Sequence, residues 1–185
     1  MNYTRREFLQ LSGLLSVAVL VNPSCTSLIP DYRVFTNDEA DCLIPMCEQI
    51  VPADDEFGGA TQANVINFID KQLYLRLKKY IPIFRNGVKA LQESCEELHG
   101  KKFQELTFDE QTMMMTQLQR NKLSEEIWEE GQAGEFFKAV LKYTMMGFYG
   151  FPRHGGNKNY MSYRMLRLDV PRVAGQNRYR DIELK

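Results

Sequence analysis

The sequence predicts an all-α fold, a single domain of about five helices followed by an irregular C-terminal segment rich in Gly, Arg and Tyr. Three observations support this prediction. Apolar residues recur every three or four positions along most of the chain, which gives a helix one apolar face. No run of β-branched residues is long enough to indicate a sheet, and helix and strand patterns do not alternate. The composition, with 44% hydrophobic and 25% charged residues, is that of an ordinary globular domain.

The first expected helix begins after a capping box. Thr36 is its cap and Glu39 follows three residues later, which predicts a helix to about residue 50. Pro45 lies inside this helix, and we expect it to kink the helix or to separate its first turn. A second helix is expected over about 61–79, where apolar residues recur every four positions.

Three further helices are expected along the chain. The third starts near Pro82, which suits a first helical turn, and stops at Gly100. The fourth follows a second capping box, formed by Thr107 and Glu110. The last runs from about Ser124 to Met146.

The N-terminus has the pattern of a twin-arginine export signal. The pair Arg5 and Arg6 is followed by Phe8 and Leu9, and then by an apolar run over 11–21. This run has the length of a signal peptide, because a membrane span needs about 20 apolar residues. We therefore expect the protein to reach the periplasm through the twin-arginine translocon.

The sequence divides into a signal segment (1–25), a linker (26–35) and a helical domain (36–185). Cys25, the last residue of the signal segment, lies just past the apolar run and is a candidate for lipidation, although Asn22 stands where lipoprotein signals usually have an aliphatic residue. Cleavage near residues 24–27, or an uncleaved signal that acts as an anchor, are the alternatives. We expect the remaining cysteines to be small buried hydrophobes rather than a disulfide framework.

Charge is distributed unevenly. Residues 31–150 contain 13 basic and 20 acidic residues, a net charge of −7, whereas residues 151–185 contain eight basic and three acidic residues, a net charge of +5. A basic segment binds acidic surfaces or nucleic acid. Export argues against nucleic acid, which leaves a protein partner or the acidic body of the same domain.

Patterns that carry catalysis are scarce. The sequence contains no dinucleotide-binding or phosphate-binding glycine motif and no haem-attachment motif. The two histidines, His99 and His154, are far apart in the sequence, and no Cys-His cluster resembles a metal site. The three methionines of 113–115 point to different sides of a helix, so we expect core packing rather than copper binding.

One segment, 147–157, combines glycines, aromatics, Pro152, Arg153 and His154 directly after the last helix. Glycines permit close backbone approach, and Phe148, Tyr149 and Phe151 offer apolar area. We expect this segment to contact a partner; the alternative is a plain helix end and a loop that packs inside its own domain. The predicted interface residues are Gly147, Tyr149, Gly150, Phe151, Pro152, Arg153, His154, Gly155, Gly156 and Asn157.

The order of these features resembles the gluconate 2-dehydrogenase subunit 3 family. The resemblance is carried by the signal, by Val51-Pro52-Ala53-Asp54, by Asn67-Phe68-Ile69-Asp70-Lys71-Gln72-Leu73 and by the Gly-rich loop. It covers about residues 36 to 170. In the loop, His154 stands where this family usually has tyrosine, which puts any role of an aromatic hydroxyl in doubt.

The resemblance implies a non-catalytic small subunit. It would bind no cofactor itself and would pair with a large FAD-dependent sugar or polyol dehydrogenase subunit of the glucose-methanol-choline type. It would escort that subunit through the translocon, and a cytochrome c would take the electrons. The alternatives are an exported stand-alone binding protein or lipoprotein adaptor, and an independent enzyme that uses His154 as its base.

Overall fold

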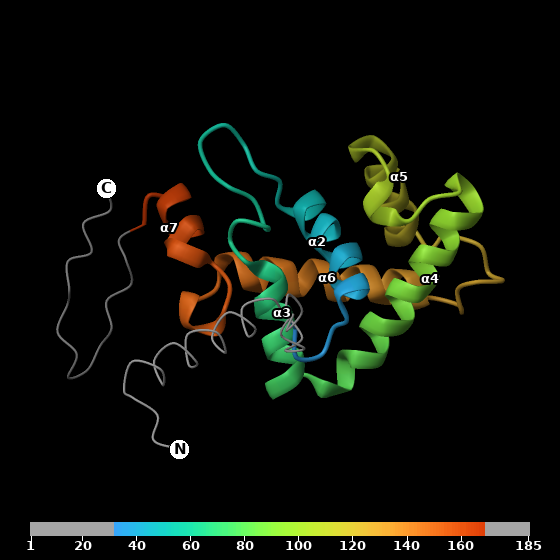
Figure 1. Cartoon of the computed structure of the whole chain (residues 1–185), viewed down its shortest axis with the longest axis horizontal. Coiled ribbons are helices and arrows are strands. Elements are labelled where there is room, and N and C mark those ends of the chain that lie inside the picture. The colour runs from blue at the N-terminus through green and yellow to red at the C-terminus, as the bar shows by residue number, and fades with distance from the viewer. Residues whose placement is uncertain (1–31, 169–185) are drawn as a thin grey trace, which may run out of the picture. The chain divides into compact units, whose positions relative to one another are not determined.

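The computed structural model describes residues 32–168, and all regular secondary structure there is helical (Figure 1). The α-helices of this part are α2 (Asn37–Ile50), α3 (Val65–Leu75), α4 (Ile81–His99), α5 (Phe108–Gln119), α6 (Gln132–Tyr149) and α7 (Met161–Met165). Short 3₁₀ turns are η1 (Lys78–Tyr80), η2 (Phe103–Glu105), η3 (Pro152–His154) and η4 (Lys158–Tyr160). The all-α prediction is confirmed. The signal, Cys25 and residues 169–185 lie outside the described residues.

Helix α6 is the centre of the domain and packs against α2, α3, α4 and α5 (Figure 1). Its apolar face supplies Phe136 and Tyr143, whose rings lie 6.3 and 6.1 Å from the ring of Phe84 in α4. Trp128 stacks on Phe136 at 6.1 Å. These aromatic side chains are buried, so contacts of α6 with α4 and with the turn that carries Trp128 form one part of a core to which α2, α3 and α5 also contribute.

Both predicted capping boxes are present. The Thr36 hydroxyl accepts a hydrogen bond from the Glu39 amide at 3.2 Å, and the Glu39 carboxylate accepts one from the Thr36 amide at 2.8 Å. Thr107 and Glu110 form the same pair of bonds at the start of α5. Gly100 ends α4 with a φ of 65°. These local signals place helix ends where the sequence predicts them.

Three expectations about helix bounds need correction. Helix α2 runs through Pro45 as one helix, so no first turn is separated, while the kink stays a prediction. The expected helix 61–79 begins only at Val65, because Asn64 has a φ of 59°, and ends at Leu75 before η1. The expected helix 124–146 begins at Gln132, because Gly131 has a φ of 75°, and it continues to Tyr149. The first three residues of the segment 147–157 therefore belong to this helix rather than following it. Before it, residues 124–131 form turns that bury Trp128, whose indole N–H donates to Ser94 at 2.9 Å.

The cysteines and methionines of the described part lie largely where they were expected. Cys42, Cys47 and Cys95 are buried and free. Burial raises the pKa of Cys47 to about 12, so it remains a thiol. Met114 and Met115 are buried, whereas Met113 is 53% exposed. Within residues 32–168, the helices are too short or too polar to cross a membrane.

Candidate partner interface

The C-terminal end of α6 lies against the N-terminal end of α3. A Cβ atom on Gly147 would lie 2.9 Å from the Phe68 ring and 3.1 Å from Val65. Such distances leave no room for a side chain, so glycine is required at this crossing. The crossing fixes the point at which the chain leaves α6 and enters the Gly-rich loop.

Asn157 closes the loop on itself. Its side chain is fully buried, donates to the Gly150 carbonyl at 2.8 Å and accepts from the Ser162 amide at 2.9 Å. Its φ of 45° is a conformation that asparagine tolerates better than most residues. Beside it, a Cβ atom on Gly156 would collide with the Gly147 carbonyl oxygen. The loop is therefore a closed unit rather than an open connection.

Helix α3 holds the loop from below. The Asn67 amide donates to the Gly155 carbonyl at 3.2 Å, and one turn later the Lys71 ammonium donates to the Arg153 carbonyl at 3.3 Å. The Lys158 amide donates to the Ala63 carbonyl at 3.1 Å. These bonds fix the backbone of the loop, so its outward side chains are presented from a defined position.

The outward side of the loop carries aromatic and cationic groups. Tyr149 is 37% exposed, and Arg153 is exposed with its guanidinium 5.3 Å from the centroid of the Phe151 ring. The Arg153 Nε donates to His154 Nε2 at 3.3 Å. Phe151, Pro152 and His154 are half-buried. This surface offers apolar area beside a cation, the composition that protein interfaces favour.

The structure places the ten predicted interface residues in the last turn of α6 and in the loop that follows it, and it divides them between two roles. Gly147, Gly156 and Asn157 are buried and make contacts within their own domain. Phe148, from which we expected apolar contact area, is fully buried in the core, because it follows Gly147 on the inner face of α6. Tyr149 and Arg153 remain available to a partner, and their contact with one stays a prediction.

Asp70 is a structural residue to which the sequence analysis assigned no role. Its fully buried carboxylate accepts hydrogen bonds from three successive amides, those of Arg33, Val34 and Phe35, at 2.8 to 3.2 Å. The Arg33 guanidinium lies 3.6 Å away. Residues 33–35, at the end of the expected linker, are thus bound to α3. The signal was available in the sequence, because an acid stands on the apolar face of the segment that carries the family resemblance.

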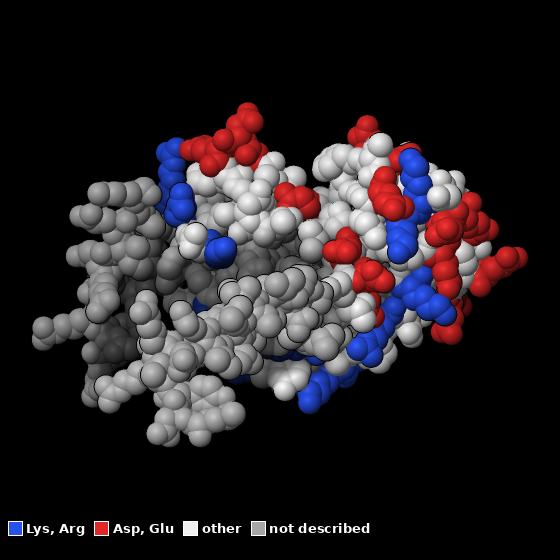
Figure 2. All heavy atoms as spheres, in the orientation of Figure 1, with Lys and Arg blue, Asp and Glu red and all other residues white. Residues whose placement is uncertain are grey.

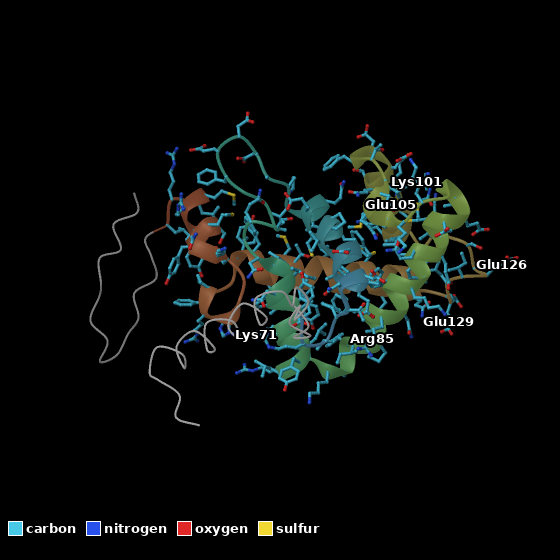
Figure 3. The ribbon with its side chains drawn as sticks, viewed as in Figure 1. Lys71, Arg85, Lys101, Glu105, Glu126 and Glu129 are labelled. Atoms are coloured by element: carbon cyan, nitrogen blue, oxygen red, sulfur yellow. The ribbon has the colours of Figure 1, made fainter. Side chains whose placement is uncertain are left out.

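The loop belongs to a basic end of the domain. Residues 150–168 contain Arg153, Lys158, Arg164 and Arg167 and no acidic residue. Figure 2 shows basic side chains beside α7, acidic side chains next to them at the loop between α2 and α3, and further acidic side chains at the opposite end of the molecule. Glu126 and Glu129 lie at that acidic end (Figure 3). The basic residues of 150–168 would attract an acidic patch on a partner.

The described residues contain no group of three or more His, Cys, Asp or Glu side chains close enough to hold a metal ion. Near the loop, His154 accepts a hydrogen bond from Arg153, so its Nε2 lone pair is occupied in this arrangement. The loop can bind a partner surface, because it presents aromatic rings, the guanidinium of Arg153 and backbone groups in fixed positions.

Comparison with known proteins identifies one family. The family model for gluconate 2-dehydrogenase subunit 3 matches residues 37–169, more than two thirds of the chain. No curated protein and no solved structure shows significant similarity to the sequence or to the fold. The match includes every α-helix of the described part as well as the loop over 147–157. The chain belongs to the gluconate 2-dehydrogenase subunit 3 family.

Proposed function

We propose that this chain is the non-catalytic small subunit of a periplasmic dehydrogenase. In this proposal it escorts a large FAD-dependent sugar or polyol dehydrogenase subunit of the glucose-methanol-choline type through the twin-arginine translocon and stabilises it afterwards. A cytochrome c accepts the electrons. The observation that carries the proposal is the closed loop over 147–157, which supports exposed aromatic and cationic side chains in a member of a family of dehydrogenase subunits.

The proposal assigns the flavin to the large subunit. A hollow between α2 and α5, lined by Ile44, Pro45, Gln49 and Phe108 among others, has a volume of about 220 Å³. Pockets that hold drug-sized ligands usually measure roughly 300 to 1,000 Å³. This hollow is therefore smaller than such pockets. Purified alone, the chain is expected to show no flavin absorbance, and a bound-flavin spectrum would contradict the assignment.

Co-purification tests the interface. The double variant Tyr149→Ala with Arg153→Ala removes the most exposed ring and the cation of the loop. It should weaken assembly with the co-expressed large subunit by about 2 kcal/mol or more, because a few aromatic and arginine anchors carry most of the energy of an interface. The isolated variant should keep its helical circular dichroism.

A matched control places the same two changes far from the loop. Phe108 is 58% exposed and Arg120 is exposed, and both belong to the α5 region. Phe108→Ala with Arg120→Ala should leave co-purification unchanged. If the loop variant also co-purified normally, the loop would not be the interface. If the isolated loop variant lost its helical circular dichroism signal, the loop would contribute to the stability of its own domain rather than to an interface.

Cell fractionation tests the escort function. Arg5→Lys with Arg6→Lys should leave both this chain and the dehydrogenase activity of its partner in the cytoplasm, because the arginine pair is the part of the signal that the translocon reads. Normal periplasmic activity in this variant would rule out co-export through the signal.

A further inference from the structure

One segment of this acidic domain is strongly basic. Residues 71–92 contain six basic residues and no acidic one, whereas the remainder of 31–150 contains seven basic and 20 acidic residues. The segment comprises the end of α3, the turn η1 and the first half of α4. Lys71 and Arg85 lie on the same lower side of the molecule in Figure 3, and basic side chains follow that edge in Figure 2.

Aromatic rings accompany these charges. Three lysines lie over tyrosine rings: Lys78 over Tyr74 at 6.0 Å, Lys79 over Tyr80 at 5.2 Å and Lys142 over Tyr143 at 5.4 Å. The rings of Tyr80 and Tyr143 meet edge to face at 5.6 Å, which brings Lys142 of α6 to the same place. Lysine and tyrosine together are typical of surfaces at a membrane–water interface.

Several apolar and cationic side chains between the end of α3 and η1 are exposed to solvent. Tyr74 and Leu75 are 50% and 55% exposed. Arg76, Lys78 and Lys79 are exposed and form no ion pair within residues 32–168. Two other basic residues of the segment do form ion pairs: Arg85 lies 3.6 Å from Glu39, and Lys89 lies 3.7 Å from Glu93. We name the surface formed by Tyr74, Leu75, Arg76, Lys78 and Lys79 the basic corner.

The basic corner lies where the N-terminal chain joins the domain. Asp70, just before it, holds the amides of residues 33–35, and Arg85, just after it, donates to the Val34 carbonyl at 3.0 Å. The apolar run of the signal ends at Val21, eleven residues before Tyr32. Eleven extended residues span at most about 40 Å. A chain held in a membrane by that run would therefore have the start of its domain, and with it the basic corner, within reach of the lipid surface.

From this arrangement we propose that the basic corner binds the surface of an anionic phospholipid membrane. Arg76, Lys78 and Lys79 contact phosphate headgroups, while Tyr74 and Leu75 lie at the level of the headgroups. What favours a lipid surface over an acidic protein here is position, because these cations lie beside residues 33–35, where the chain that follows the signal enters the domain. The proposal does not depend on the partner interface, because it concerns other residues and another class of binding partner.

Vesicle flotation of the full chain tests the proposal. The readout is the ratio of binding to phosphatidylglycerol-containing vesicles over phosphatidylcholine vesicles, since the apolar run of the signal binds both kinds. Arg76→Gln with Lys78→Gln and Lys79→Gln should lower this ratio about tenfold or more, because each basic group near an anionic surface contributes several-fold. The ratio of the unchanged chain should also fall as salt is raised, since salt screens charge.

The control variant makes the same change in charge at the other end. Lys101→Gln with Arg120→Gln and Lys122→Gln alters three exposed cations of the α4–α5 end and should leave the ratio within about twofold. Circular dichroism of both variants shows whether the fold is intact. An unchanged ratio in the corner variant, or an equal loss in the control, would overturn the proposal. So would an unchanged ratio together with loss of the large subunit, which would make the corner a protein interface.

Discussion

The α4–α5 end of the domain and the α3–loop end are built from different kinds of contact. At the α4–α5 end, Gly100 stops one helix and the Thr107–Glu110 capping box starts the next, through bonds between residues three or four apart. At the α3–loop end, Asn67 bonds to Gly155 across 88 positions and Lys71 to Arg153 across 82. The comparison teaches that the helix ends of the first end are set by local bonds, to which Gln49 of α2 adds bonds with Phe108, Gln111 and Thr112 across 59 to 63 positions. The loop of the second end is bound to α3 by tertiary contacts.

The largest effect is expected from Asp70→Ala. This change leaves three buried or partly buried amides of residues 33–35 without their acceptor and removes the partner of Arg33. The free energy of unfolding should fall by about 3 to 5 kcal/mol, since breaking a buried charged network is costly. Urea denaturation measures the change.

The matched control for Asp70 is Asp109, an acid in the first turn of α5. Asp109→Ala should lower stability by about 1 kcal/mol or less, the usual contribution of a charge at a helix N-terminus. Equal losses for the two variants would mean that the α3–loop end depends on long-range contacts no more than the other end does.

Two glycines give a second test of the comparison. Gly156→Ala places a methyl group against the Gly147 carbonyl and should cost about 3 kcal/mol, because the backbone there cannot yield without breaking the loop. Gly100→Ala meets open space and only has to adopt a φ of 65°, which should cost about 1 to 2 kcal/mol. Thermal unfolding of the two variants should therefore rank Gly156→Ala as the less stable. The reverse order would show that backbone conformation matters more than close packing in this domain.

The same division explains what could be predicted from the sequence. Capping boxes and Gly100 gave correct helix ends because a cap is a contact between near neighbours. The predicted start of α3 was wrong because apolar spacing alone does not reveal that Asn64 adopts a left-handed conformation. Ser124 resembled a helix start, but the burial of Trp128 between α4 and α6 keeps residues 124–131 in turns.

For the candidate interface, composition located the loop but could not assign its residues to roles. Glycine and asparagine are compatible with an exposed contact surface and with close internal packing. Only the crossing of α3 and α6 shows that Gly147 and Asn157 serve the loop's own closure, while Tyr149 and Arg153 face outward. The function of Asp70 depends on a partner 35 to 37 positions away, a relation that no local pattern contains.

A smaller effect is expected from removing a cap. Thr107→Ala deletes the hydroxyl that accepts from the Glu110 amide and should lower the free energy of unfolding by about 1 kcal/mol. Thr107→Ser should restore most of the loss, because serine supplies the same acceptor. Urea denaturation of the three chains measures both differences. A loss above about 3 kcal/mol would mean that this end, too, depends on contacts beyond its local signals.

The smallest effect, and the one most specific to a local signal, is a pH dependence carried by Glu110. Hydrogen bonds from the Thr107 amide and hydroxyl hold the pKa of the Glu110 carboxyl below its usual value of 4.5. A carboxyl with a lowered pKa in the folded state stabilises the fold above its ordinary pKa, and this contribution is lost as pH falls through the lowered value. Glu110→Gln can still accept these bonds but does not titrate. Its stability should therefore lie slightly below that of the unchanged chain at pH 7, and the gap should close at acid pH.

Because His99 Nδ1 lies 4.0 Å from the Glu110 carboxylate, the comparison is repeated in a His99→Asn background. If the gap persists there, it arises from the capping box; if it disappears, it arises from the contact between α4 and α5.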